Sequence, residues 1–556
     1  MNPTYQTLSV AAILKESAQR SPDRIAIAVG DDEISYARLW DETRAYAGAL
    51  RSRGVKPGDA VGVLIPNVAD FPRVYYAILS LGAVVVPVHA LLKADEIEYV
   101  LRDSGATILI CAAPLLAEGE WGGALAGVPV FSVLSPEPIE GVPQLEVLAA
   151  EAEPIDTYVP RAPYDTATIL YTSGTTGKPK GALGSHLALV EQTNTLLLNT
   201  FDLTDADTVL GCLPLFHTFG QTCALNTGLR AGSKIVLLPK FSGEAALRAL
   251  IDSECTVMMG VPTMYIALLE AAKHTDDRPK LRYAVSGGAS LPLAIIEKFK
   301  DVFGVEIYEG YGLTETSPVA SFNHVGREPR PGSVGQAIWG VDVEIAKSDV
   351  DDSVELLPLG ELGEIVIRGH NLMSGYLNLP EESAKAVVDG WFRTGDLGTK
   401  DSDGYIWIVD RKKDMVVRNG YNVYPREVEE VLNRHPDVSS VAVFGVADES
   451  HGQEVMACVV LSSDSEVETD ALLEFAKEKL AAYKYPRRIE IVETLPLGPS
   501  GKVLKRELVL QYESEARRVS EDAPASDDAR ASEDAPASED APVSEDAQRE
   551  DSDARM

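Results

Sequence analysis

Residues 171–181 read Tyr171-Thr172-Ser173-Gly174-Thr175-Thr176-Gly177-Lys178-Pro179-Lys180-Gly181, directly behind a β-branched and aromatic run at 168–172. That run predicts a strand that ends in a loop. Glycines let successive backbone N–H groups point at an anion, while hydroxyls add donors and lysines add charge. The segment therefore predicts a phosphate-binding loop, with a solvated strand-to-helix turn as the alternative. A Walker loop is excluded, because that pattern needs a glycine where this chain has Thr172.

Length and composition describe a chain of several units. With 556 residues, 45% hydrophobic and 24% charged, it has the composition of a soluble globular protein of roughly two to four units. The five cysteines form no C-x-x-C pair and have no histidine at zinc spacing. They predict reduced thiols in a cytoplasmic protein, without a structural metal or disulfide framework.

Two function classes are excluded by charge and hydropathy. The apolar run at 77–92 is interrupted by Gly82, Pro87 and His89, which predicts a buried helix end and strand instead of a membrane span. Peripheral membrane contact is left open. The net charge of -35 argues against nucleic acid as a partner.

The first 165 residues alternate apolar strands with amphipathic helices. Strands are expected at 25–29, 60–65, 83–88, 108–111 and 128–133. This alternation predicts an α/β fold with mostly parallel sheet. Two later strands, 281–286 and 305–308, run into glycine-bearing segments, 287–289 and 309–316. Ligands of doubly wound sheets lie outside the carboxyl ends of strands, so both segments are candidate binding elements beside 171–181.

The five consecutive charges at 410–414 divide the chain. Beyond them, a helix from Pro425, strands at 438–446, 455–461 and 488–492 and a helix at 470–483 predict a small α+β domain. The expected domains are therefore 1–409, a multi-sheet N-terminal domain, and 410–512, a hinged C-terminal domain. Residues 513–556 are expected to form a disordered tail, because the Ser-Glu-Asp-Ala-Pro-Ala repeats from Ser520 combine like charges with prolines and few apolar residues.

Taken together, these segments resemble the adenylate-forming enzymes, the superfamily of acyl-CoA synthetases, luciferases and peptide-synthetase adenylation domains. The resemblance covers about residues 8–512 and looks closest to long-chain fatty-acid–CoA ligases. It rests on 171–181, 214–217, 287–289, 309–316, 394–396, 410–432 and the loop that carries Lys502. It implies a large AMP-binding domain and a small domain hinged at Asp410.

The resemblance also implies individual roles. Lys502, His217 and Glu315 would be catalytic, and Thr172 and Glu315 would hold Mg²⁺. Nucleotide and CoA contacts would come from Thr172, Ser173, Gly174, Thr175, Thr176, Gly177, Lys180, Gly287, Gly288, Ala289, Glu309, Gly310, Tyr311, Gly312, Thr314, Asp396, Arg411, Lys413, Arg418, Gly420 and Tyr421. Each position also has an ordinary explanation: His217 as a packing residue beside aromatics, Asp396 as a turn cap, and Lys502 as an exposed loop lysine.

The implied activity uses ATP, Mg²⁺ and CoA to convert a medium- to long-chain fatty acid to its CoA thioester through acyl-AMP. The segments expected to line the acyl site, 217–221, 261–267 and 286–289, carry no Arg or Lys to pair a second carboxylate. Alternatives are transfer to a carrier protein, ligation of an aryl or short-chain acid, and a non-catalytic nucleotide-binding scaffold. A homodimer is left open.

Overall fold

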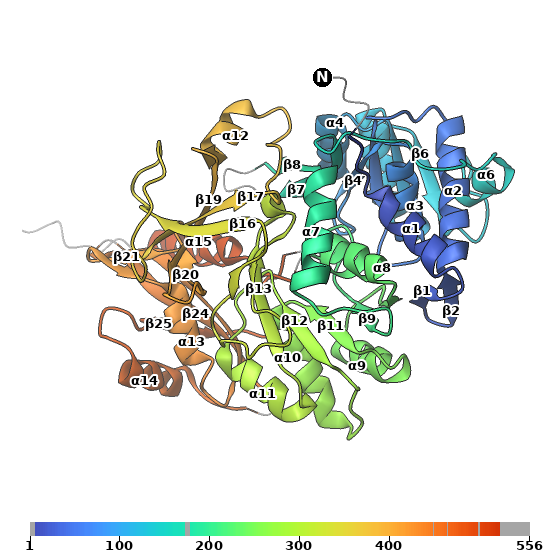
Figure 1. Cartoon of the computed structure of the whole chain (residues 1–556). Helices are drawn as coiled ribbons and strands as arrows, with labels where there is room; N and C mark the ends of the chain where they lie inside the picture. The colour runs from blue at the N-terminus through green and yellow to red at the C-terminus, as the bar shows by residue number, and fades with distance from the viewer. Residues whose placement is uncertain (1–5, 173–177, 449, 464, 499–500, 523–556) are drawn as a thin grey trace, which may run out of the picture. The chain divides into compact units, whose positions relative to one another are not determined.

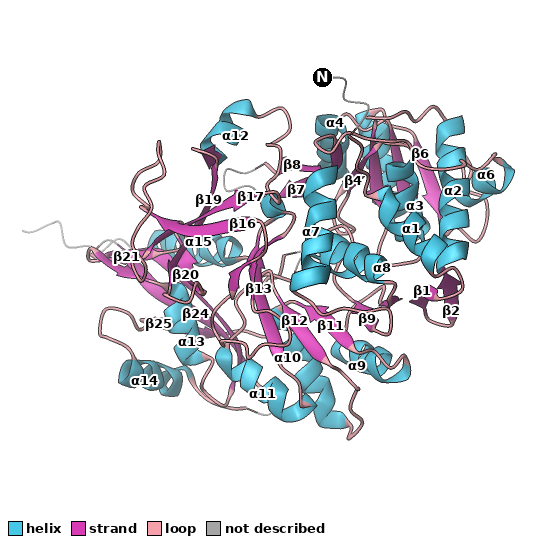
Figure 2. Cartoon of the chain, viewed as in Figure 1, coloured by secondary structure: helices cyan, strands magenta, loops and turns pink. Residues whose placement is uncertain are grey.

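The computed structural model describes residues 6–172, 178–448, 450–463, 465–498 and 501–522. Within these ranges the strands form four sheets, three in a large N-terminal domain and one in a small C-terminal domain (Figure 1). Helices alternate with strands through most of the chain (Figure 2). The predicted α/β class with a large multi-sheet domain and a small α+β domain is confirmed.

The first sheet has the strand order β6-β5-β3-β4-β7-β8 and is parallel except for β8. Its strands are β3 (Ala60–Leu64), β4 (Val84–Pro87), β5 (Ile108–Ala112), β6 (Val130–Val133), β7 (Thr166–Thr172) and β8 (Lys180–Ser185). The helices along it are α3 (Asp70–Ser80), α4 (Ala94–Ser104), α5 (Leu116–Ala126) and α6 (Leu145–Glu151). Because β8 runs antiparallel to β7, the predicted phosphate segment lies between two strands, and the strand-to-helix alternative is wrong.

The second sheet has the order β15-β14-β13-β12-β11-β9-β10-β1-β2. Its strands are β1 (Ile25–Val29), β2 (Asp32–Ser35), β9 (Thr208–Gly211), β10 (Lys234–Leu237), β11 (Val257–Gly260), β12 (Tyr283–Ser286), β13 (Ile307–Gly312), β14 (Val319–Phe322) and β15 (Gln336–Ala337). Its helices are α1 (Ala11–Arg20), α2 (Tyr36–Ser52), α7 (His186–Asn199), α8 (Thr227–Ala231), α9 (Gly243–Asp252), α10 (Pro262–Ala271) and α11 (Leu293–Phe303). The strand predicted at 25–29 thus pairs with β2 and β10 and belongs to a different sheet from the other strands predicted in the first 165 residues.

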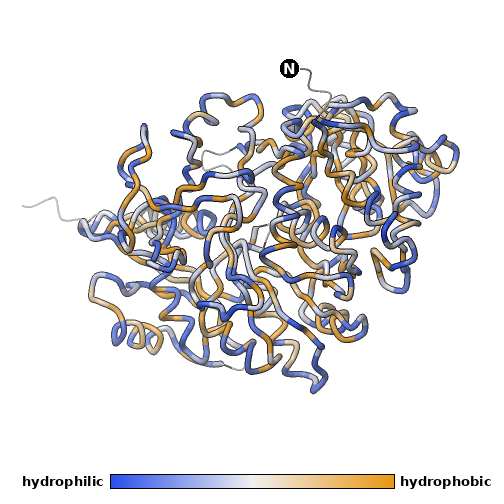
Figure 3. Tube along the Cα trace, viewed as in Figure 1, coloured by the Kyte–Doolittle hydropathy of each residue, from blue (hydrophilic) through white to orange (hydrophobic). Residues whose placement is uncertain are grey.

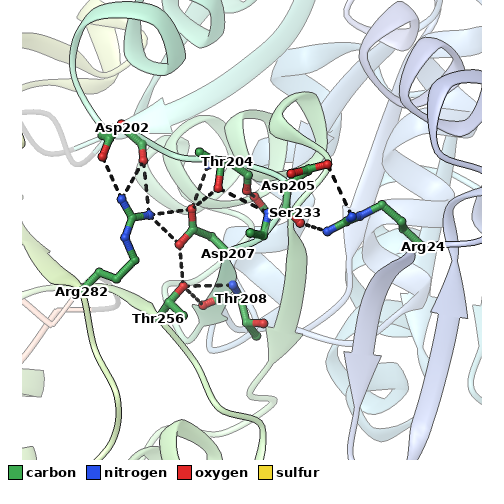
Figure 4. Close-up of polar contacts among 10 residues, drawn as sticks. Arg24, Asp202, Thr204, Asp205, Asp207, Thr208, Ser233, Thr256 and Arg282 are labelled. Carbon is green, nitrogen blue, oxygen red and sulfur yellow. Dashed lines mark hydrogen bonds and ion pairs between the residues drawn. The ribbon is translucent and has the colours of Figure 1, made fainter.

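An ion-pair network lies at the amino-terminal ends of the central strands of this sheet (Figure 4). Arg282 Nη1 donates to both oxygens of Asp207 at 2.7 Å, and Thr256 Oγ1 donates to Asp207 Oδ1 at 2.7 Å. Arg282 also pairs with Asp202. These residues directly precede β9, β11 and β12, so the network fixes the starts of the strands and lies at the opposite edge from their carboxyl ends.

The third sheet is antiparallel, with the order β16-β17-β19-β18 and with β20 beside β19. Its strands are β16 (Val341–Ala346), β17 (Gly363–Gly369), β18 (Val387–Val388), β19 (Trp391–Lys400) and β20 (Ile406–Arg411), and α12 (Pro380–Ala386) lies between β17 and β18 in the chain. Strand β20 includes Asp410 and Arg411, so the charged run that divides the chain begins inside this sheet.

The small domain has a sheet and a hydrophobic core of its own. The sheet order is β22-β21-β24-β23, with β25 beside β24: β21 (Val416–Arg418), β22 (Tyr421–Val423), β23 (Val438–Asp448), β24 (Gly452–Leu461) and β25 (Arg488–Ile491). Helices α13 (Pro425–Leu432) and α14 (Thr469–Lys479) complete it. Its core includes Val428 and Leu432 of α13 and Leu472 of α14.

The last helix, α15 (Lys505–Asp522), corrects one expectation. The sequence analysis placed the start of a disordered tail at residue 513, yet the chain stays helical to Asp522. Residues 513–519 contain no proline or glycine and include good helix formers, whereas Pro524 is the second residue after the helix end. Residues 523–556 lie outside the described part.

The apolar stretches of the chain follow the buried strands, as the hydropathy colouring shows (Figure 3). The predicted interruption of the run at 77–92 is present: α3 ends at Ser80 and β4 begins at Val84. No helix in the described ranges is long and apolar enough to span a membrane.

Candidate active site

A cavity of about 1240 Å³ lies against the carboxyl ends of β12 and β13, the β7–β8 pair and the third sheet. Ligand pockets are typically about 300–1,000 Å³, so this cavity has room for a nucleotide and a second ligand. The predicted residues on its wall are Thr172, Lys180, His217, Gly287, Gly288, Gly310, Tyr311, Gly312, Thr314, Glu315, Arg411, Lys413 and Lys502. Residues from distant parts of the sequence and from both domains therefore meet in one place.

Other predicted residues do not line this cavity. Ser173, Gly174, Thr175, Thr176 and Gly177 lie outside the described residues. Among described residues, the wall does not include Ala289, Glu309, Asp396, Arg418, Gly420 and Tyr421. Of the segments expected to line an acyl site, 217–219 and 286–288 do so, but no residue of 261–267 does. Val261 lies just behind the wall, since a Cβ on Gly288 would lie 3.5 Å from its Cγ1, whereas the α10 backbone at Ala267 packs against Gly243 of α9.

Asp396 lies directly behind the wall and is almost fully buried. The hydroxyl of Tyr311 donates to its Oδ2 at 2.6 Å, and Arg411 Nε lies 3.1 Å from its Oδ1. The register of β19 and β20 places Asp396 directly opposite Arg411, which explains why these two residues meet. Burial raises the pKa of Tyr311, and the Asp396 carboxylate raises it further, so this phenol remains a donor.

Glu315 is held by a residue that the sequence analysis did not identify. Its carboxylate accepts a hydrogen bond from the Tyr376 hydroxyl at 2.8 Å, and its carbonyl accepts one from Met373 N at 2.8 Å. Both bonds come from the segment between β17 and α12. Burial and the Glu315 carboxylate raise the pKa of Tyr376, which keeps its proton available for the bond. No sequence signal beyond a Gly-Tyr pair marks this residue.

The wall suits a metal ion that is held jointly with a ligand. Among the described residues, no cluster of three or more His, Cys, Asp or Glu could hold a metal without other ligands. Magnesium in phosphate-transfer sites is usually held by one or two carboxylates together with substrate phosphates. The buried Glu315 carboxylate and the nearby Thr172 hydroxyl fit that arrangement.

Lys180 is positioned by α12. Its Nζ lies 2.6 Å from Glu382 Oε2 and 5.3 Å from the centre of the Tyr376 ring. Because Tyr376 also contacts Glu315, the lysine and the glutamate on the cavity wall share one supporting side chain. The fixed geometry of the two charged groups therefore depends on the chain around residue 376.

His217 and Lys502 influence each other in the cavity. Burial lowers the pKa of His217 to about 4, and the nearby positive charge of Lys502 contributes. The imidazole is therefore neutral near pH 7, and its Nδ1 accepts from Phe219 N at 3.2 Å. Burial also lowers the pKa of Lys502 to about 8, with Arg411 acting in the same direction and Asp396 and Glu315 opposing it. Lys502 thus stays mostly cationic near pH 7.

Gly312 is explained by packing within the sheet. Strand β14 returns antiparallel beside β13, and a Cβ on Gly312 would lie 1.7 Å from Pro318 O. The first half of the segment 309–316, up to Gly312, is thus part of β13 itself. The close approach of one backbone to another requires glycine here.

Arg418, Gly420 and Tyr421 lie on the β21–β22 hairpin of the small domain, away from the cavity wall. Arg418 pairs with Tyr421 across the hairpin, so Asn419 and Gly420 form its two-residue turn. Both have positive φ, 52° and 78°, as a type I′ turn requires. Arg418 Nε is 2.7 Å from Glu454 Oε1, whereas the Tyr421 side chain is exposed.

One further predicted residue lies close to the wall, and a pair that sequence reasoning missed lies on it. Glu309 is buried, its Oε2 accepts from Gly332 N at 3.2 Å, and burial raises its pKa to about 7. The pair that sequence reasoning missed is Arg393 with Glu364, at 2.6 Å and almost fully buried. Glu364 also accepts from Gly395 N at 2.9 Å, so the pair fixes the turn before Asp396.

Comparison with known proteins adds to this geometry. Residues 14–377 match the family described as AMP-binding enzyme, and residues 427–502 match the AMP-binding enzyme C-terminal domain. The chain is 33% identical to a long-chain-fatty-acid–CoA ligase of Bacillus subtilis, over 92% of this chain and 96% of that protein. It is 37% identical to a feruloyl-CoA synthase of an Amycolatopsis species, over 88% and 96%.

A solved structure shares the fold at similar identity. The ATP-bound MatB from Rhodopseudomonas palustris superimposes with a TM-score of 0.83 at 31% identity, covering 92% of this chain and 100% of that one. The two relatives named above differ in the acid that their names specify, a fatty acid and ferulic acid.

Proposed function

We propose that this chain, which belongs to the adenylate-forming AMP-binding enzymes, joins a carboxylic acid to coenzyme A through an acyl-AMP intermediate. The observation that carries the proposal is the position of Lys502. This residue of the small domain lines the same cavity as Glu315, Thr172 and Arg411 of the large domain. A cation beside a carboxylate suited to Mg²⁺ is what a reaction between an acid and a nucleoside triphosphate requires.

In the first half-reaction, an oxygen of the substrate carboxylate attacks the α-phosphorus of ATP and pyrophosphate leaves. Both reactants are anions, so positioning and charge neutralisation dominate the barrier. Lys502 offsets the negative charge that builds between them. Tyr311 and Asp396 receive the nucleoside, with Asp396 accepting ribose hydroxyls. When bound at Glu315 and Thr172, Mg²⁺ neutralises phosphate charge.

In the second half-reaction, the thiol of CoA attacks the acyl carbonyl and AMP leaves. We propose that the small domain reorients for this step, so that Lys502 leaves the cavity and residues 418–421 enter it. His217 lines the cavity as a neutral imidazole, with its Nδ1 occupied by Phe219 N. It therefore positions the acyl group by a hydrogen bond from Nε2 and does not supply a positive charge.

A medium- to long-chain aliphatic acid is the proposed substrate. Pro87, Leu92, Phe216, Phe219 and Val319 give the cavity an apolar wall. The segments 217–219 and 286–288 on that wall carry no Arg or Lys, so a second carboxylate there would be costly to bury. The 33% identity to the Bacillus subtilis fatty-acid–CoA ligase supports this choice, and the feruloyl-CoA synthase keeps an aryl acid as the second candidate.

The test is a pair of assays on the full chain with a panel of acids. Acid-dependent exchange of pyrophosphate into ATP reports adenylation, and thioester formation with free CoA identifies the acceptor. We expect both activities, with a higher kcat/KM for dodecanoate than for ferulate or malonate. Exchange without thioester would favour a carrier protein as acceptor, and absence of exchange with every acid would favour a non-catalytic scaffold. A preference for malonate would refute the apolar acyl site.

A further inference from the structure

The joint between the two domains contains a carboxylate that caps a helix of the other domain. Asp410, the second-last residue of β20, accepts from the backbone N of Arg426 at 2.9 Å. Arg426 lies in the first turn of α13, and its Nη1 donates to Ile408 O at 2.6 Å. Backbone N–H groups at a helix start have no partner within the helix, and they attract negative charge. The large domain thus supplies the cap for α13 of the small domain.

Lys505 reaches the same joint from the start of α15. Its Nζ lies 2.7 Å from Glu429 Oε1, which also accepts from Val443 N at 2.8 Å. Burial alone would lower the pKa of Lys505, but the Glu429 and Asp410 carboxylates more than offset it and raise that pKa. Lys505 is therefore attracted at once to α13 of the small domain and to β20 of the large domain.

Lys505 is joined to Lys502 by a short, internally bonded segment. Gly498 N donates to Lys502 O at 2.6 Å, Leu504 N donates to Pro496 O at 2.8 Å, and Leu497 bridges to Val503. These bonds leave little freedom between the two lysines. Fixing Lys505 at the joint consequently fixes where Lys502 enters the cavity.

We propose that Lys505, with Asp410 and Glu429, latches the small domain in the orientation that delivers Lys502, and so acts as a positioning residue for the first half-reaction alone. This inference rests on the proposed function. Asp410 is buried in this orientation, where its charge needs compensation from Arg411 N, Arg426 N and Lys505. Without Lys505, the joint would favour an orientation that returns Asp410 to water.

The matched control is Lys484. It also pairs with a glutamate of α13, lying 2.7 Å from Glu427 Oε1. The groups that raise the pKa of Lys484 are Glu427 and Tyr483. Lys484→Met therefore removes a lysine–glutamate pair from the same helix and domain without disturbing the proposed latch. Lys505→Arg restores the charge and serves as the rescue variant.

The experiment measures both half-reactions and the domain orientation in the full chain. Spin labels at Glu270→Cys and Ser463→Cys report the orientation, because Ser463 of the small domain donates to Glu270 Oε1 of α10 at 3.0 Å. The native cysteines are all buried, so labelling is selective. We expect Lys505→Met to lower pyrophosphate exchange by about tenfold and to reduce the short-distance population. Conversion of supplied acyl-adenylate and CoA to thioester should stay within about twofold of wild type.

Three results would overturn the latch: equal losses in both half-reactions, an unchanged distance distribution, or the same losses in Lys484→Met. Failure of Lys505→Arg to recover exchange would also count against it. The proposed function fails separately. If the wild-type enzyme makes no thioester, CoA is not the acceptor. Pyrophosphate exchange and the spin-label distance can still test the latch in that case. If the wild-type enzyme shows no pyrophosphate exchange, the proposed adenylation is wrong. The spin-label distance still tests the latch.

Discussion

Two parts of the small domain, Lys502 and the 418–421 turn, have opposite positions relative to the cavity. Lys502 lies on its wall, whereas the turn lies away from the wall. Arg418 is paired with Glu454, while Lys502 has no carboxylate within ion-pair distance among the described residues. The difference supports the proposal that the orientation seen here serves one half-reaction. In that proposal Lys502 is the cation that meets an anionic ligand, and the turn moves before it takes part.

The largest effect should come from removing Lys502. Electrostatic stabilisers of this kind contribute about 3–4 kcal/mol, or roughly 10² to 10³ in rate. Lys502→Ala should lose pyrophosphate exchange by about that factor, keep ATP binding, and still convert supplied acyl-adenylate and CoA to thioester. Lys477→Ala on α14, where the lysine pairs with Glu474 within its own helix, is the control and should leave both rates within about twofold.

Either of two outcomes for Lys502→Ala would contradict the assignment of Lys502 to the first half-reaction. If the variant formed acyl-adenylate at the wild-type rate, its cavity position would have no catalytic meaning. If it failed equally in thioester formation, the lysine would serve both steps or the fold, and the proposed reorientation would lose its support.

The 418–421 turn should show the reverse pattern. Gly420→Leu should lower thioester formation about tenfold while leaving pyrophosphate exchange within about twofold, because the turn is away from the cavity during adenylation. Gly420 has a positive φ, so leucine also strains the hairpin by about 1 kcal/mol. Gly420→Asn is the control, since asparagine tolerates that conformation at the smaller size. Equal thioester loss in the two variants would contradict the assignment of the effect to side-chain bulk.

The pH dependence of adenylation should show the contribution of the Lys502 charge. The pKa of Lys502 is lowered to about 8, so its cationic form is complete well below pH 8 and is lost as pH rises through 8. The kcat/KM for adenylation, which reports the free enzyme, should fall about tenfold per pH unit above that value. Lys502→Arg should be slower but should lack this alkaline decline, because arginine stays charged. An identical decline in both enzymes would assign it to another group.

The sequence predicted the strands and loops better than the tertiary contacts that position the site residues. Strand and loop positions at 168–181, 281–289 and 305–316 could be read because β-branched runs and glycines act locally. Tyr376 could not be found, since its role depends on meeting Glu315 sixty-one residues away. The same holds for Arg393 with Glu364. For Gly420 the resemblance implied a ligand contact, whereas the structure gives a turn that demands positive φ.

The sequence also does not show which charged residues are buried. The run at 410–414 would ordinarily be a solvated turn, yet Asp410 is buried at the end of β20 and capped onto α13. Nothing in the local sequence indicates that a second domain covers this carboxylate.

The smallest effect is expected from deleting the acidic repeats. This deletion tests whether the different roles of Lys502 and the 418–421 turn depend only on the two folded domains. Deleting residues 523–556 keeps all of α15, whose first turn holds Lys505. At about 0.15 M salt, charges separated by more than about 8 Å are largely screened. The truncated enzyme should therefore retain kcat for both half-reactions within about twofold and become less soluble, because the deletion removes net negative charge. A tenfold loss confined to one half-reaction would instead implicate the repeats in the orientation of the small domain.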